Sequence, residues 1–318
     1  MMLLRGNEPM KIVTLTLNPA FDLHCHIDDF QPFHENLAEI TDLEAGGKGV
    51  NISRALTVMG VDNLAIVTLG QENGDVFRHH LERDGISFEA IAVPGRIREN
   101  ITVHTDTADE TRISFKGFSA DGSLLDKAER LIEPMLGDDL CLTVTGRLPA
   151  GVDMAAVKAL LGRLRDRGVK IVVDSRSFAT ADLLDVRPWL IKPNQEEISM
   201  YLGREIGGFD DALAGAKELC AAGIENVMVS LGAQGAMLVT ADAAYIAAAP
   251  SVTVVSTIGA GDSMIAGFIA AKKQGQSDAV CLQTAVAYGS AACEMPGTRP
   301  PEKDTVAWLI EKIQTYQL

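Results

Sequence analysis

Short runs of apolar, largely β-branched residues alternate with segments of helical spacing along most of this chain, and this alternation constrains its fold most strongly. Apolar runs without polar alternation are typical of strands covered on both faces, as in parallel sheets. Their regular exchange with helices predicts βαβ units. We therefore expect an α/β fold in which helices flank a mostly parallel central sheet. The predicted strands are 11–17, 64–69, 88–93, 140–144, 170–173 and 189–191, and the predicted helices include 74–84, 154–167, 277–293 and 304–315.

One segment breaks this rhythm. Residues 100–105 and 111–116 alternate polar with apolar side chains around a polar turn at 108–110, which predicts a β-hairpin with one buried face. We expect the hairpin to belong to a small separate sheet, with 37–43 as a candidate partner strand, that covers a cleft or meets a second subunit. The expected division is a core of 10–21, 47–93 and 119–318, a lid of 22–46 and 94–118, and an extension at 1–9 that we expect to be disordered.

Composition excludes several classes of partner. The 318-residue chain has 47% hydrophobic residues and a formal net charge of −15. A negative protein is poorly suited to nucleic acid or to an anionic membrane surface, because both are polyanions. The five cysteines form no Cys-x-x-Cys pair, and no window of the sequence approaches a membrane-spanning length of apolar residues. A cytoplasmic protein with reduced thiols is expected.

A glycine-rich turn is the strongest candidate for chemistry. Gly259, Ala260, Gly261 and Asp262 follow the apolar run 252–255 and precede an apolar helical stretch, so they are predicted to form a strand-to-helix turn. Free amides at a helix start bind anions, and a carboxylate beside them suits a base that works next to a transferred phosphoryl group. The alternative is that the glycines turn the chain and the aspartate caps the helix. These residues alone favour neither reading, although Met264 argues against a dinucleotide-binding turn.

Four further positions suggest a function only in combination. Lys48 lies within a second glycine cluster and could neutralise a phosphate, or could be a solvated lysine in a flexible turn. Asp22 is expected just past the carboxyl end of the first strand, the edge where ligands bind in open parallel sheets, or else to be an ordinary turn aspartate. Asn194 and Glu197 straddle the predicted start of a helix.

Together, these motifs resemble the ribokinase-like carbohydrate kinase (PfkB) family from Lys11 to the carboxyl end. The 259–262 turn is similar to that family's anion hole and catalytic base, and 46–51 is similar to its amino-terminal signature. The segment 192–197 resembles the part that positions magnesium and ATP phosphates, and 230–235 resembles the nucleotide-side turn. The resemblance implies a Rossmann-like ribokinase fold with a small β-sheet lid that joins two subunits in a homodimer.

The resemblance is greatest to the branch that phosphorylates sugar phosphates. It implies transfer of the γ-phosphoryl group of ATP, with Mg²⁺, to a hydroxyl of a ketohexose phosphate. Fructose 1-phosphate is the first expectation, with tagatose 6-phosphate and fructose 6-phosphate as alternatives. A kinase for nucleosides or free sugars is disfavoured, because Lys48 and Arg98 would then face nothing anionic. A sensor that has lost turnover is disfavoured because Asp262, Asn194 and Glu197 are intact.

The family roles can be carried over to individual positions. Arg147 departs from the branch, which usually has a serine in this segment. We expect it to contact the substrate phosphate alongside Lys48 or Arg98, the alternative being a surface arginine. The implied catalytic residues are Asp262, Gly259, Ala260 and Gly261; the implied substrate-binding residues are Asp22, Gly46, Gly47, Lys48, Asn51, Arg98, Asn100 and Arg147; the implied ATP-binding residues are Lys192, Asn194, Ser230, Gly232, Gly235 and Thr257; and Glu197 is implied to bind the metal through water.

Overall fold

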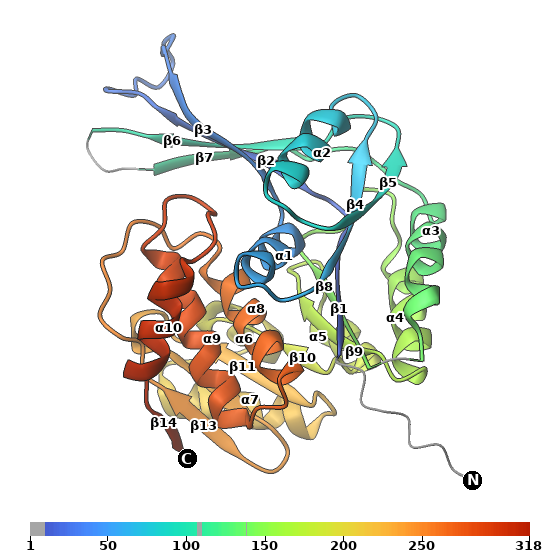
Figure 1. Cartoon of the computed structure of the whole chain (residues 1–318), viewed down its shortest axis with the longest axis vertical. Coiled ribbons are helices and arrows are strands. Elements are labelled where there is room, and N and C mark those ends of the chain that lie inside the picture. The colour runs from blue at the N-terminus through green and yellow to red at the C-terminus, as the bar shows by residue number, and fades with distance from the viewer. Residues whose placement is uncertain (1–9, 107–109, 138) are drawn as a thin grey trace.

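The computed structural model describes residues 10–106, 110–137 and 139–318 and contains one large and one small β-sheet (Figure 1). The large sheet is parallel from its β5 edge to β11 and antiparallel beyond it. This confirms the predicted mostly parallel α/β fold. In spatial order its strands are β14 (Thr315–Gln317), β13 (Ala244–Ala247), β12 (Ala236–Val239), β11 (Asn226–Ser230), β10 (Leu190–Ile191), β9 (Lys170–Asp174), β8 (Leu140–Thr145), β1 (Lys11–Thr16), β4 (Leu64–Gly70) and β5 (Phe88–Val93).

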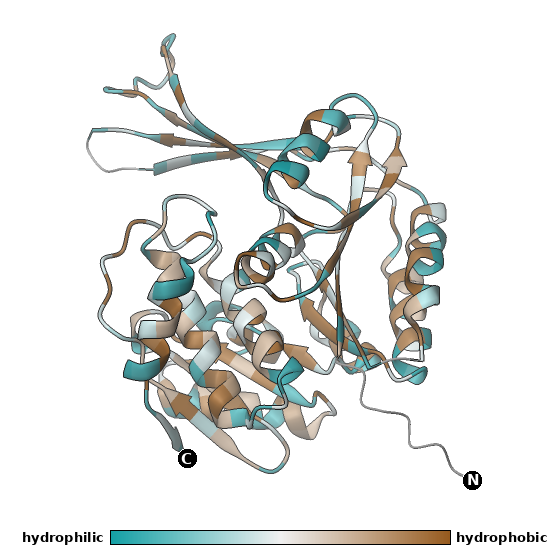
Figure 2. Ribbon diagram, in the orientation of Figure 1, coloured by the Kyte–Doolittle hydropathy of each residue, from teal (hydrophilic) through white to brown (hydrophobic). Residues whose placement is uncertain are grey.

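Helices cover both faces of this sheet. The two faces can be told apart in β1, where Ile12 and Val13 point into different hydrophobic clusters. One cluster holds α2 to α7, and the other holds α1, α8, α9 and α10. Figure 2 shows the hydrophobic residues running along the enclosed strands. The helices are α1 (Lys48–Val58), α2 (Gly74–Arg83), α3 (Ser123–Ile132), α4 (Met154–Asp166), α5 (Thr180–Val186), α6 (Gln195–Leu202), α7 (Phe209–Ala221), α8 (Ala260–Lys273), α9 (Asp278–Cys293) and α10 (Lys303–Lys312), with short 3₁₀ turns η1 (Glu133–Met135) and η2 (Gly232–Gln234).

The small sheet extends away from the body of the molecule (Figure 1). Its strand order is β3 (Glu39–Gly46), β2 (Ala20–His26), β6 (Arg98–His104) and β7 (Glu110–Ser114). Antiparallel pairing of β6 with β7 confirms the predicted hairpin, whose turn at 107–109 lies outside the described residues. That the small sheet acts as a lid with the expected boundaries stays a prediction. The extension at 1–9 also lies outside the described residues.

Two local expectations for this sheet were wrong. Asp22 was expected in a turn just past the first strand, but the chain re-enters an extended strand at Ala20, which makes Asp22 part of β2. The segment expected to pair with the hairpin pairs with β2 instead, and β2 separates it from β6. Local patterns could not show this, because β2 is defined by neighbours far away in the sequence.

The apolar run before the glycine turn is also not a strand. Residues 251–255 are irregular, and the side chains of Val254 and Val255 are 60% and 57% exposed. β-branched residues favour strands only where a neighbouring strand completes the ladder, and no such neighbour lies alongside this run in the described structure. The glycines therefore link an irregular segment to α8, whose residues 262–271 are all buried, as the sequence predicted for this helix.

No helix in the described part of the chain has the length and apolar character needed to cross a bilayer.

Candidate active site

A cleft of about 1080 Å³ opens where the loops after β10 and β11 approach the start of α8. Its apolar wall is formed by residues such as Pro250, Val252 and Val286, and its polar wall includes Lys48 and Glu197. A cleft with an apolar side and convergent polar groups suits a nucleotide. All the residues predicted to bind ATP line it: Lys192, Asn194, Ser230, Gly232, Gly235 and Thr257.

Asp262 lies in the first turn of α8, directly after Gly261, which lines this cleft. The preceding Gly259 has a φ of 81°, a left-handed conformation that glycine adopts readily, and it starts the helix without a side-chain cap. Asp262 is 6% exposed, and its Oδ2 accepts a hydrogen bond of 2.9 Å from Asn51 Nδ2. The N-cap of α8 is Gly259 and no side chain caps the helix, so Asp262 does not have the capping role that was the alternative to catalysis.

The surroundings of Asp262 tune its acidity. Burial raises the pKa of Asp262 to about 6, a shift limited by the positive charge of Lys48 and by the hydrogen bond from Asn51, while the nearby Asp174 adds to it. A general base is most effective when its pKa is close to the working pH. The side chain is thus both ionised at neutral pH and basic enough to take a proton.

Lys48 begins α1 and lies between two carboxylates. Its Nζ donates a hydrogen bond of 2.8 Å to Oδ1 of Asp174 at the end of β9. Burial alone would lower the pKa of Lys48, but the charges of Asp174 and Asp262 raise it above its usual range. The other oxygen of Asp174, Oδ2, is buried without a hydrogen-bond partner among the described residues. The structure thus groups Lys48 with Asp174 and Asp262, whereas the sequence reasoning had grouped it with Arg98.

Asp174 was not among the predicted site residues. The available signal was its position at the carboxyl end of a buried strand, at the same sheet edge where the ligands of α/β proteins bind. The neighbouring Lys192 also belongs to this group, because a Cβ atom on Gly261 would lie 2.8 Å from Lys192 Nζ. Glycine at 261 lets this ammonium group lie against the first turn of α8.

A second polar group surrounds Asp22 in the small sheet. Asp22 is buried, and its Oδ1 accepts hydrogen bonds from Asn100 Nδ2 at 2.8 Å and from Arg112 Nη2 at 3.2 Å. Asn100 lies directly opposite Asp22 in the pairing of β2 with β6. Sequence reasoning placed Asp22 and Asn100 together at a sugar site and missed Arg112, whose position in the hairpin gave no signal of a role.

Three arginines, Arg98, Arg112 and Arg147, form what we call the arginine group. The charges of Arg112 and Arg147 both act on Arg98. Burial lowers the pKa of Arg98; the negative charge of Asp22 opposes this, and the positive charges of Arg147 and Arg112 add to it. Arg98 Nε is buried and has no hydrogen-bond partner in the described structure. Buried donors that lack a partner are uncommon and fit an anionic ligand. The exposed Arg147 thus lies near Arg98, but the role expected for it stays a prediction.

Asn194 and Glu197 form a capping box at the start of α6. Asn194 Oδ1 accepts from the backbone of Glu197 at 2.8 Å, and Glu197 Oε2 accepts from the backbone of Asn194 at 3.1 Å. Glu197 Oε1 also accepts a long contact of 3.4 Å from Arg176. Both residues thus have a structural role in addition to lining the cleft, and metal binding by Glu197 stays a prediction.

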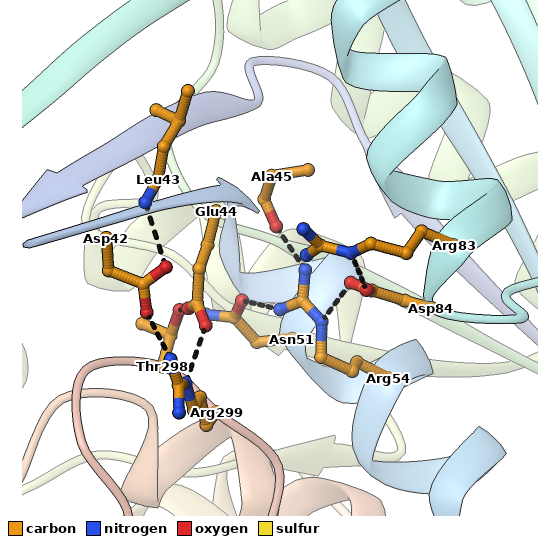
Figure 3. A network of polar contacts seen from close by, with 10 residues as sticks. All are labelled: Asp42, Leu43, Glu44, Ala45, Asn51, Arg54, Arg83, Asp84, Thr298 and Arg299. Atoms are coloured by element: carbon orange, nitrogen blue, oxygen red, sulfur yellow. Dashed lines mark hydrogen bonds and ion pairs between the residues drawn. The ribbon is translucent and has the colours of Figure 1, made fainter.

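The small sheet is tied to the loop before α10 (Figure 3). Thr298 Oγ1 donates to Oε2 of the buried Glu44 at 2.6 Å. Arg299 forms ion pairs with Asp42 at 2.8 Å and with Glu44 at 3.5 Å. These contacts hold β3 against the carboxyl-terminal part of the core and fix the side of the site that carries Asp22.

Comparisons with known proteins agree with this geometry. The family model described as pfkB family carbohydrate kinase matches residues 16–305. A 1-phosphofructokinase of Escherichia coli strain K12 is 33% identical over 303 residues, which cover 95% of this chain and 97% of that protein. A 1-phosphofructokinase of Haloferax volcanii is 35% identical over 298 residues, 93% of this chain and 95% of that protein.

Solved structures give the same result. Phosphofructokinase-2 from Escherichia coli, in complex with substrates and products, superposes with a TM-score of 0.90 at 28% identity, covering 95% of this chain and 99% of that one. The family match extends over nearly the whole chain and includes the small sheet as well as the core. The chain therefore belongs to the pfkB family of carbohydrate kinases.

Proposed function

We propose that this enzyme transfers the γ-phosphoryl group of ATP to a hydroxyl of fructose 1-phosphate, forming fructose 1,6-bisphosphate. One observation carries the proposal: burial raises the pKa of the Asp262 carboxyl to about 6, and the charge of Lys48, which lines the nucleotide-sized cleft, acts on this same carboxylate. The relatives named 1-phosphofructokinase support the choice of acceptor. The chain is thus a phosphotransferase with an alcohol group as acceptor.

In the proposed reaction, the acceptor hydroxyl attacks the γ-phosphorus as the bond to the β-phosphate oxygen breaks. Asp262 takes the hydroxyl proton, and the amides of residues 259–262 stabilise the charge that develops on the transferred group. Asp22 and Asn100 hold sugar hydroxyls, and Arg98, Arg112 and Arg147 bind the phosphate that the sugar already carries. Catalysis depends mainly on positioning the two substrates, because the protein takes little part in the covalent chemistry.

ATP and magnesium fit the residues present. The cleft has room for a nucleotide, and Lys192 and Lys48 supply positive charge where the phosphates would lie. Carboxylate oxygen is the ligand type that Mg²⁺ prefers, usually with several waters retained, which suits Glu197 at the cleft wall. When bound, the metal would neutralise charge on the ATP phosphates.

Fructose 6-phosphate is the second candidate acceptor, because the chain also resembles Escherichia coli phosphofructokinase-2 solved with fructose 6-phosphate, at a TM-score of 0.88. An assay of ADP release across fructose 1-phosphate, fructose 6-phosphate, tagatose 6-phosphate, fructose and adenosine decides between them. We expect the highest kcat/KM with fructose 1-phosphate and little turnover of fructose or adenosine. Preference for a 6-phosphate would overturn the assignment of the acceptor, and no turnover above an Asp262→Asn control would favour a sensor.

We also propose a homodimer formed through the small sheet. Its edge strand β7 is exposed along its whole length, with Ile113 on it and Phe115 just after it both exposed. An open edge with exposed apolar residues is rare in a monomer. Light scattering should report a dimer that an Ile113→Asp substitution dissociates.

The five cysteines are unpaired, which fits a cytoplasmic location.

A further inference from the structure

A buried arginine, Arg54, connects Asn51 with the end of β3 in the small sheet (Figure 3). Arg54 lies in α1 and is 4% exposed. Its Nε donates to Asp84 Oδ2 at 2.9 Å, its Nη1 donates to Asn51 Oδ1 at 3.3 Å, and its Nη2 donates to the carbonyl oxygen of Ala45 at the end of β3. One planar guanidinium thus joins α1, the end of α2 and the small sheet.

The contact with Asn51 fixes the direction of a carboxamide. A carboxamide accepts at its oxygen and donates at its nitrogen, whereas a guanidinium only donates. Because Oδ1 of Asn51 accepts from Arg54, its Nδ2 faces the other way and donates to Asp262 at 2.9 Å. A rotated amide would turn its NH₂ group toward the guanidinium and its oxygen toward the carboxylate, and both new contacts would be repulsive.

We propose that Arg54 is a positioning residue that holds the Asn51 carboxamide with its NH₂ group toward the catalytic carboxylate of Asp262. The inference rests on the proposed function for the role of Asp262. Arg54 itself contacts neither the cleft nor the arginine group around Asp22. Its role is to give Asp262 a hydrogen-bond donor in place of an acceptor, and Asp84 and Ala45 hold the guanidinium in the required plane.

The charges that face Asp262 stay in place when Arg54 is changed. Lys48 comes from α1, Asp174 from the end of β9, and Lys192 from the segment after β10. A substitution at Arg54 removes none of these groups. The change does remove the positive charge of Arg54 itself, and the double variant with Asn51→Ala separates that charge effect from the loss of the hydrogen bond from Asn51.

The test replaces Arg54 by methionine, which has similar bulk and no donor. Without its partner the carboxamide can rotate, so the ionised form of Asp262 loses a donor and its pKa rises. We expect the acid limb of kcat/KM to move up by about one pH unit, the usual equivalent of one hydrogen bond to a charged group. Asn51→Ala should give a similar shift, and the double variant should shift no further, because both changes remove the same interaction.

Arg83→Met is the matched control. Arg83 donates to the other oxygen of Asp84 at 3.1 Å, is 55% exposed, and has no contact with Asn51 among those drawn in Figure 3. The same chemical change at the far end of the network should leave the pH profile unchanged. An equal shift in this control would mean that the network acts through Asp84 or through general stability, which would overturn the proposal.

A second measurement does not depend on activity. The carboxyl group of Asp262 can be titrated by carbon-13 NMR in the ligand-free protein, with its signal assigned by its absence in Asp262→Asn. We expect a midpoint of about 6 in the natural chain and a midpoint about one unit higher in Arg54→Met. If no sugar phosphate is turned over, the proposed function fails, but this titration still decides the role of Arg54.

An unchanged NMR midpoint in a folded Arg54→Met chain would overturn the proposal, as would additive shifts in the double variant. If Arg54→Met does not fold, Arg54→Lys is used instead. Its ammonium group keeps a charge beside Asp84 but cannot bond Asp84 and Asn51 together in the planar geometry of a guanidinium. We then expect a shift in the same direction, and its absence counts against the role of Arg54.

Discussion

Gly46 and Asp22 lie so close that no side chain fits between them: a Cβ atom on Gly46 would be 2.0 Å from Oδ2 of Asp22. Gly46 ends β3 and is paired with Ala20 of β2. Its backbone needs no special conformation, so the reason for glycine here is space. The missing side chain allows a buried carboxylate to lie between Asn100 and Arg112.

Gly46→Ala should therefore displace Asp22 and weaken sugar binding. We expect KM for the sugar phosphate to rise about ten-fold or more, because hydrogen bonds to a charged group each contribute about 1.5–3 kcal/mol, while KM for ATP changes little. Gly162→Ala in α4 is the control, since no described atom outside the helix backbone lies within 4 Å of its Cβ position. Normal sugar kinetics in Gly46→Ala would show that Asp22 is not a sugar ligand.

Asp262→Asn should lower kcat by roughly 10²–10⁴, with small changes in both KM values, because a general base acts in the transition state. The exposed Asp166→Asn, at the end of α4, supplies the control. Steady-state kinetics on both variants test the assignment. Near-normal turnover in Asp262→Asn would show that Asp262 is not the general base.

The same substitution should stabilise the protein at high pH. The folded pKa of Asp262, about 6, lies above the ordinary aspartate value of 3.8, so the folded state binds more protons than the unfolded state between these pH values. Stability therefore falls as pH rises through this window, and the full cost is present above pH 6. We expect Asp262→Asn to raise the free energy of unfolding by about 2–3 kcal/mol at pH 8. Urea melts at pH 8 and pH 4.5 should show the gain shrinking at the lower pH; a constant gain would contradict a raised pKa.

The arginine group predicts selectivity for phosphorylated sugars. Replacing Arg98 or Arg112 by methionine, or Arg147 by serine, should raise KM for the sugar phosphate roughly ten- to a hundred-fold, since each change removes a charge-assisted contact. The weak turnover of free fructose should not change in the Arg147→Ser variant, because Arg147 has no contact with Asp22 among the described residues. Arg96→Met is the control, because Arg96 is exposed and pairs with Glu99. If Arg147→Ser alone has no effect, Arg147 points to solvent.

Lys48→Met should change the KM for ATP and the pKa of Asp262 more than the KM for the sugar phosphate. Lys48 lines the nucleotide cleft and its charge lowers the pKa of Asp262. We expect a larger KM for ATP and an acid limb of kcat displaced to higher pH. A selective rise of KM for the sugar phosphate would instead restore the role first expected for Lys48 from the sequence.

The sequence by itself determined the architecture and most of the residues that line the nucleotide cleft. Apolar runs and helical spacing are local properties, so the parallel sheet, the hairpin and the buried helix after Gly259 could be read from them. Lys192, Asn194 and Ser230 line one cleft because each lies at or just after the carboxyl end of β10 or β11, on the same edge of the sheet. Chain order alone places such residues together.

Only the tertiary structure decided which charged groups meet. Lys48 and Asp174 are 126 positions apart, Asn51 and Asp262 are 211 apart, and Asp22 and Arg112 are 90 apart. No local pattern specifies such pairs. Residues 252–255 have strand-forming side chains but no partner strand within the described part of the chain, whereas 20–26 form a strand because β3 and β6 lie beside them. Local propensity sets what a segment can form, and the neighbours supplied by the fold decide what it does form, because a strand or a buried charge is stable only with its partner in place.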